Sequence, residues 1–142
     1  MNIVLIGCGT IGRTILEELT KEGHTLTIID EDKNKVSKMI EKYDVSGVTG
    51  NGASLDILQA AGVKDADLLI CESTYLKGQT KTSDNHLYAF EAGKIARDAN
   101  AKKLLLTHFW PEIDRDLYVN EAKEFFGNTE ASIEGKKLIL RR

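Results

Sequence analysis

The chain has 142 residues, a net charge of −3 and an apolar share of 42%. This length suits one domain with a buried core, and the charge gives no reason to expect nucleic acid or an anionic membrane surface as a partner. Without a signal-peptide pattern, an apolar run of roughly 20 residues or more than two cysteines, we expect a cytoplasmic protein with no membrane insertion and no disulfide framework.

Along the first half, apolar runs alternate with helical patterns, which favours a parallel sheet with helices on its faces. The strands that these runs predict are Asn2–Ile6, Thr25–Ile29, Val45–Thr49 and Asp67–Cys71. Helices are predicted from about Ile11 to Glu22, around Val36–Tyr43, and between Ser54, a favourable N-cap, and Gly62.

The second half continues the alternation. The elements predicted here are a long helix from Ser83 to about Asn100, a strand at Lys103–Thr107, and a helix that Asp114 caps and that buries Tyr118, Ala122, Phe125 and Phe126. Thr129–Ser132 and Lys137–Leu140, around Glu134-Gly135, predict an edge hairpin. The fold class is therefore a three-layer α/β Rossmann-like parallel sheet, with strand order 3-2-1-4-5 and a C-terminal edge hairpin.

A glycine pattern follows the first strand and opens the first helix. Its residues are Gly7-Cys8-Gly9-Thr10-Ile11-Gly12-Arg13. The first glycine permits a tight turn, the second lets the backbone approach a pyrophosphate, and the third lets the helix pack close to the strand. The N–H groups at the helix start then face the phosphates. This is the fingerprint of a dinucleotide site, and the alternative is a tight turn that binds nothing.

Asp30 closes the second strand, where a carboxylate accepts hydrogen bonds from a ribose and repels a 2′-phosphate. We therefore expect NAD(H) rather than NADP(H), the alternative being a solvated acid at a helix start. Arg13 could reach a phosphate or lie on the surface, and Asn51 could border the adenine or serve only as a turn residue between glycines.

Residues 1 to about 70 resemble the nucleotide-binding domain of the Trk/Ktr (RCK-type) potassium-transport regulators. The glycine segment carries the match together with Glu22-Gly23-His24, Ile29-Asp30-Glu31-Asp32, Gly50-Asn51-Gly52 and Ala61-Gly62-Val63-Lys64-Asp65-Ala66-Asp67. The resemblance implies that the glycines hold a pyrophosphate, that Asp30 binds the adenosine ribose, and that the Asn51 loop borders the adenine.

A second set of motifs begins at about Asp67 and comprises Asp67-Leu68-Leu69-Ile70-Cys71-Glu72-Ser73-Thr74, Asp84-Asn85-His86-Leu87, Glu91-Ala92 and Lys103-Leu104-Leu105-Leu106-Thr107-His108-Phe109. With these residues, the chain from about Asp67 onward resembles the C-terminal part of a metallo-β-lactamase-fold hydrolase near ribonuclease Z. The resemblance implies that His108 corresponds to a zinc ligand, and that Glu72 and His86 lie near a catalytic centre.

The two resemblances favour an engineered chimera, with natural fusion as the alternative. We expect one domain over 1–142, built from 1–70 and 71–142, with a junction at about 63–71. The His-x-His-x-Asp-His cluster that supplies most zinc ligands in the hydrolases is missing here. We therefore expect no metal and no catalytic residue, and Cys71, Glu72, His86 and His108 are interpreted as leftover residues at strand ends, with adventitious zinc or nickel binding as the alternative.

Cys8 and Cys71 lie at the carboxyl ends of neighbouring strands of the predicted sheet and are interpreted as small buried side chains rather than a redox pair. The leading functional hypothesis is a non-catalytic NAD(H)-binding domain, in which transport regulation is implied for the parent family and not for this chain. The alternatives are a dehydrogenase or a metal-dependent hydrolase, and a stable fold that binds no ligand. A homodimer is an open alternative for its assembly.

Overall fold

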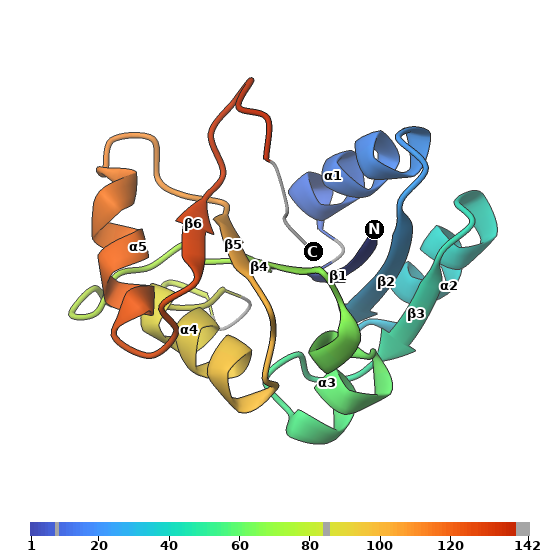
Figure 1. The fold of residues 1–142 in the computed structure, drawn as a ribbon, viewed down its shortest axis with the longest axis horizontal. Helices are drawn as coiled ribbons and strands as arrows, with labels where there is room; N and C mark the ends of the chain where they lie inside the picture. Colours follow the sequence, from blue (N-terminus) through green and yellow to red (C-terminus); the bar gives the residue numbers. More distant parts are fainter. Residues whose placement is uncertain (8, 84–85, 139–142) are drawn as a thin grey trace.

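A computed structural model of the chain describes residues 1–7, 9–83 and 86–138. Among these residues, six strands form one parallel sheet in the order β3-β2-β1-β4-β5-β6 (Figure 1). The strands are β1 (Asn2–Ile6), β2 (Thr25–Asp30), β3 (Ser46–Thr49), β4 (Leu68–Glu72), β5 (Leu104–Thr107) and β6 (Thr129–Ala131). The first five lie within two residues of the predicted segments, so the α/β class and the order 3-2-1-4-5 are confirmed, with β6 added beside β5.

The helices connect successive strands. They are α1 (Thr10–Lys21), α2 (Lys33–Lys42), α3 (Leu55–Ala60), α4 (Ala89–Asp98) and α5 (Arg115–Lys123), and a 3-10 turn spans Val63–Asp65. Asp114 caps α5 as predicted, because its carboxylate accepts a hydrogen bond from the backbone N–H of Asp116 at 3.0 Å. Ser54 occupies the N-cap position of α3, although its side chain makes no capping hydrogen bond.

Both faces of the sheet are buried, and alternate residues of one strand serve opposite faces. Ile3 and Leu5 of β1 belong to the core with Leu16 of α1, together with residues of α2. Val4, between them, belongs to the core that contains Leu58 of α3 and residues of α4 and α5. The sheet is therefore the middle of three layers, with α1 and α2 on one face and α3, α4 and α5 on the other.

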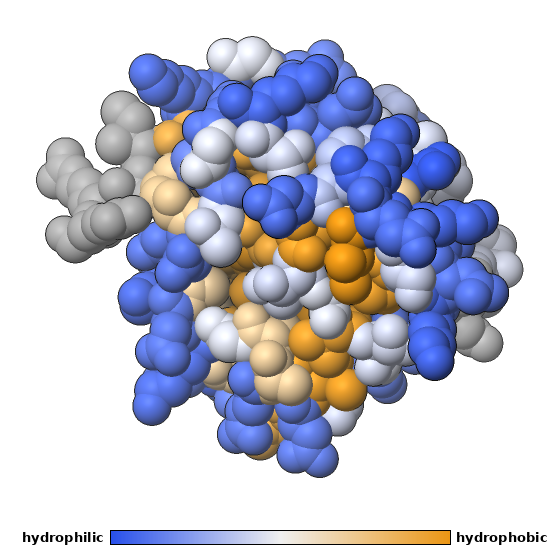
Figure 2. Space-filling model, turned by 90° about the vertical axis from the view of Figure 1, so that its right-hand side faces the viewer, coloured by the Kyte–Doolittle hydropathy of each residue, from blue (hydrophilic) through white to orange (hydrophobic). Residues whose placement is uncertain are grey.

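The side of the molecule at which α2 and β3 lie is less completely covered. Figure 2 shows apolar atoms there within a largely hydrophilic border. β3 ends the sheet, and Ile40 on α2 keeps 43% of its surface exposed. In the described part of the chain, no helix combines the length and apolar character needed to cross a membrane.

The second strand of the predicted C-terminal hairpin is wrong as far as residue 138, whereas the first strand forms. Thr129–Ala131 forms β6, which runs parallel to β5, because α5 returns the chain to the start of the sheet before β6 begins. A turn does form after β6, where the backbone N–H of Lys136 donates to the carbonyl of Ile133 at 3.0 Å. The chain beyond it is no strand up to Leu138, whose side chain packs against the core on the α1 face. Residues 139–140 of the predicted hairpin lie outside the described residues.

The predicted start of the fourth helix at Ser83 is also wrong, because α4 begins at Ala89. The residues just before α4 make other contacts: the backbone N–H of Leu87 donates to Glu72, and Tyr88 forms an isolated parallel bridge with Tyr75. The carboxylate of Glu91 accepts a hydrogen bond from the Tyr88 N–H at 3.3 Å. These interactions hold the chain in an extended form until the helix begins.

Phe125 and Phe126 differ from their prediction as core residues of the last helix. α5 ends at Lys123, and both phenylalanines are half-buried in the segment that follows. Tyr118 and Ala122 are fully buried, as predicted. The helical spacing therefore identified the buried face correctly but extended it beyond the end of the helix.

Candidate functional site

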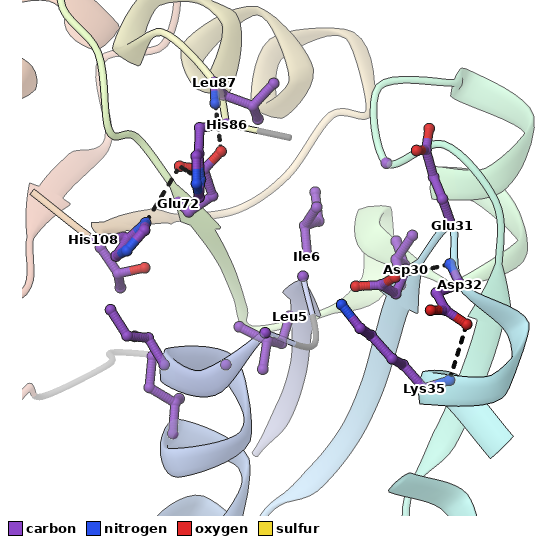
Figure 3. A pocket seen from close by; sticks show the side chains of 18 of the residues that line it. Leu5, Ile6, Asp30, Glu31, Asp32, Lys35, Glu72, His86, Leu87 and His108 are labelled. Carbon is purple, nitrogen blue, oxygen red and sulfur yellow. Dashed lines mark hydrogen bonds and ion pairs between the residues drawn. The ribbon is translucent and has the colours of Figure 1, made fainter. Parts of the chain in front are cut away.

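A cavity of about 740 Å³ opens at the carboxyl ends of the strands, beside the point where the chain order reverses between β1 and β4 (Figure 3). Ligands of open parallel sheets bind at such a switch point, because the loops that leave neighbouring strands there diverge to opposite faces. Three parts of the chain line the cavity: the glycine turn after β1, the acidic end of β2, and the ends of β4 and β5.

The glycine turn brings backbone groups to the floor of the cavity. Gly7 has a φ of +102°, a conformation that side chains rarely adopt. Gly9 occupies the N-cap position of α1, and a Cβ at this residue would stand in open space. Gly12 has no such space, because a Cβ there would collide with the carbonyl oxygen of Gly7. The turn thus exposes the start of α1, which has no acidic residue in its first turn and suits an anion.

Asp30, the last residue of β2, lies at one end of the cavity. One oxygen of its carboxylate accepts a hydrogen bond from the backbone N–H of Asp32 at 2.8 Å, which holds the turn into α2. Asp32 in turn caps α2 by accepting from the N–H of Asn34 at 2.9 Å. The carbonyl of Asp30 accepts from the N–H of Gly50 at 2.9 Å and so holds the following loop beside it.

Asn51 belongs to that loop and lines the same cavity. Its side-chain oxygen accepts a hydrogen bond from the N–H of Ala53 at 2.8 Å, an interaction typical of a turn. Both interpretations of this residue are therefore compatible with its position, since the side chain stabilises the loop and also borders the cavity.

Most of the predicted binding residues meet at this cavity. Those that line it are Gly7, Gly9, Thr10, Ile11, Gly12, Asp30 and Asn51. Arg13 is exposed on α1 and is not among the described lining residues, and Cys8 lies outside the described residues. Sequence reasoning missed Lys35, whose side chain extends toward the cavity from the first turn of α2 near Asp30 (Figure 3). The signal in the sequence that could have identified Lys35 is its place in the first turn of the helix that follows Asp30.

The ends of β4 and β5 bring Glu72, His86 and His108 together at the far end of the cavity (Figure 3). Glu72 Oε2 lies 3.6 Å from His86 Nδ1 and 3.9 Å from His108 Nδ1. Cys71, which we grouped with these residues, does not join them: it is completely buried in the core, and burial raises the pKa of its thiol well above the usual range.

The parallel sheet, the glycine turn at the start of α1 and the cavity at the strand ends define a Rossmann-like α/β domain. The chain belongs to the TrkA-N domain family, whose profile matches residues 3–85.

Two groups of curated relatives match the sequence. A Trk system potassium uptake protein TrkA from Vibrio alginolyticus is 36% identical over 70 residues, which are 49% of this chain and 15% of that protein. A ribonuclease Z from Protochlamydia amoebophila is 44% identical over 69 residues, which are 46% of this chain and 22% of that enzyme. Each match therefore covers about half of this chain and a small part of its relative.

Solved structures share the fold over nearly the whole chain. The TrkA-N domain of the Escherichia coli inner membrane protein YbaL superimposes with a TM-score of 0.69 and 22% identity, over 94% of this chain and 87% of that one. The C-terminal domain of Shewanella denitrificans Kef in its AMP-bound form superimposes with a TM-score of 0.61 and 21% identity, over 93% of this chain and 72% of that one. The GsuK channel bound to NAD superimposes with a TM-score of 0.61 and 12% identity, over 90% of this chain and 21% of that one.

Proposed function

We propose that this chain is a non-catalytic domain that binds NAD(H) in the cavity at the strand ends. The backbone at Gly7, Gly9 and Gly12 holds the pyrophosphate against the start of α1, and Asp30 accepts hydrogen bonds from the adenosine ribose. The observation that carries the proposal is the cavity itself, which joins the open turn at Gly9 to Asp30 in one continuous space.

The charges around Asp30 support NAD(H) over NADP(H). Glu31 and Asp32 follow Asp30 directly and also line the cavity, so a 2′-phosphate would meet three acidic side chains and one lysine, Lys35. NAD and AMP are the ligands named for GsuK and the Kef domain, and both ligands share the adenosine monophosphate unit that this end of the cavity would accept.

The proposal stops at nucleotide binding. Potassium uptake is the activity in the name of the TrkA relatives, of which the matched segment is a small part. We infer further that 1–142 forms one domain joined from 1–70 and 71–142. Support for this comes from relatives of two kinds, each matching about half of the chain, and from β4, which pairs with β1 on one side and β5 on the other. A homodimer stays a prediction.

Calorimetric titration of the protein with NADH, and separately with ADP, tests the proposal. We expect one-to-one binding that is tighter for NADH. Asp30→Ala should weaken it by about tenfold or more, because a hydrogen bond to a charged group contributes roughly 1.5–3 kcal/mol. Glu31→Ala is the matched control, since it removes a neighbouring carboxylate that lines the same cavity.

Three results would contradict the proposal in different ways. Equal affinity for ADP and NADH would limit the site to the adenosine half of the cofactor. Unchanged affinity in Asp30→Ala would remove Asp30 from the site. No binding of either nucleotide to a protein that melts cooperatively would leave a fold without a ligand. Because Asp30 also holds the turn into α2, Asp30→Asn serves as a second variant if Asp30→Ala loses its cooperative melt.

A further inference from the structure

Glu72, His86 and His108 come from three separate parts of the chain: the end of β4, the segment before α4, and the residue after β5. Each offers one atom able to bind a metal, and these atoms all lie within 4.8 Å of one another. The two imidazole rings are 5.0 Å apart between centroids. In Figure 3, the side chains of His86 and His108 both lie next to the Glu72 carboxylate.

We propose that Glu72, His86 and His108 form a binding site for a divalent transition ion such as Zn²⁺ at one end of the cavity. Two imidazoles and one carboxylate are a donor set that zinc accepts, with a fourth position left for water or another ligand. Donors around a tetrahedral zinc ion stand about 3.4 Å apart, as follows from metal–ligand distances of about 2.1 Å. The separations of 3.6 and 3.9 Å between Glu72 and the histidines already approach this spacing.

The hydrogen bonds around the three residues favour an ion rather than a closed network. His86 Nδ1 is buried and has no hydrogen-bond partner among the described residues, so it has a lone pair or a proton to satisfy. Glu72 is held in place, because it accepts hydrogen bonds from the Leu87 N–H and from the Thr74 hydroxyl, the latter at 2.8 Å. The same hydroxyl lies 2.9 Å from His108 Nδ1, a contact that His108 exchanges for the ion when this nitrogen binds it. An ion would satisfy the unpartnered nitrogen of His86 without disturbing the backbone.

The site is open to entering ions. The side chains of His86 and His108 are 33% and 34% exposed, and that of Glu72 is 18% exposed. This arrangement differs from the one that the hydrolase resemblance implies, in which His108 alone of the three is a ligand. From sequence we expected no metal site because the ligand cluster of the hydrolases is missing, whereas here Glu72 and His86 supply the additional donors.

Titration of metal-free, tag-free protein with Zn²⁺ in a calorimeter, without nucleotide, tests this site independently of the NAD(H) proposal. We expect one equivalent to bind, and His86→Ala and His108→Ala each to weaken binding by more than about 100-fold, since even residues that only support a ligand change affinity by about 10- to 100-fold. His24→Ala is the matched control, because His24 is the one remaining histidine of the chain. It contacts Glu22 and the N-terminus and is not among the residues that line the cavity.

Thermal melts of each variant establish that it is folded, and His86→Gln and His108→Gln replace any alanine variant that is not. The proposal is overturned if the parent protein shows no saturable Zn²⁺ binding. It is also overturned if the folded His86 and His108 variants bind Zn²⁺ as tightly as the parent, because the ion then sits elsewhere.

Discussion

Gly12 of α1 packs directly against the carbonyl oxygen of Gly7, with no room for a Cβ between them. This contact lets the start of α1 lie directly against the turn that follows β1, beside the cavity. Gly9, between the two in sequence, has open space around its Cα. All three glycines line the cavity, but the backbone itself requires glycine at Gly7 and Gly12, whereas at Gly9 a Cβ would meet no other atom.

This division predicts opposite effects of the same substitution. Gly12→Ala forces α1 away from β1 and should lower the free energy of unfolding by about 1–3 kcal/mol, as overpacked sites do. Gly9→Ala should cost less than about 1 kcal/mol, the difference between glycine and alanine at an N-cap. Because its methyl group would stand where a phosphate approaches, it should weaken NADH binding at least about tenfold. Urea unfolding and calorimetry measure the two quantities, and equal stability losses in both variants would contradict the division.

A second close approach joins the two helices α4 and α5. A Cβ on Gly93 would lie 2.5 Å from the carbonyl oxygen of Ala122. Alanine is the better helix former by about 1 kcal/mol, yet we expect Gly93→Ala to lower the free energy of unfolding by about 1–3 kcal/mol because the helices must separate. Gly127→Ala is the control, as nothing lies within 4 Å of the Cβ that it adds. A Gly93→Ala protein that is more stable than the parent would show that α4 and α5 can separate at little cost.

Cys71 provides a prediction on pH dependence. Burial raises the pKa of its thiol well above the usual range, so the folded chain retains a proton that the unfolded chain releases above about pH 8.5. Stability should therefore fall as the pH rises through that value, by at most about 1.4 kcal/mol per pH unit. Cys71→Ala lacks this proton, so the difference in free energy of unfolding between parent and variant should narrow with rising pH. A difference that stays constant from pH 8 to about pH 10 would contradict the prediction.

The central strands β1 and β4 were the most predictable, because both of their faces are buried. Such strands consist of continuous apolar runs, as in Ile3–Ile6 and Leu68–Cys71, which stand out from the helical patterns between them. The position of Asp30 beside the glycine turn was predictable for a related reason. Parallel strands place their carboxyl ends at one edge of the sheet, so neighbouring strand ends meet there whatever the loops do.

Helix boundaries were less predictable where distant residues compete with local propensity. Ser83 is a good local N-cap, but the contacts of Leu87 with Glu72 and of Tyr88 with Tyr75 hold the chain extended up to Ala89. The pairing of β6 with β5 was likewise decided at long range, because α5 returns the chain to the start of the sheet before β6 begins.

The sequence by itself determined the α/β class, the order of the first five strands and the residues at the glycine turn and Asp30, because these depend on hydrophobic periodicity and on local backbone requirements. The tertiary structure alone decided that Lys35 lines the cavity and that Glu72, His86 and His108 meet at one point. Whether side chains far apart in the chain come within bonding distance depends on the course of the loops that carry them, which hydrophobic periodicity does not specify.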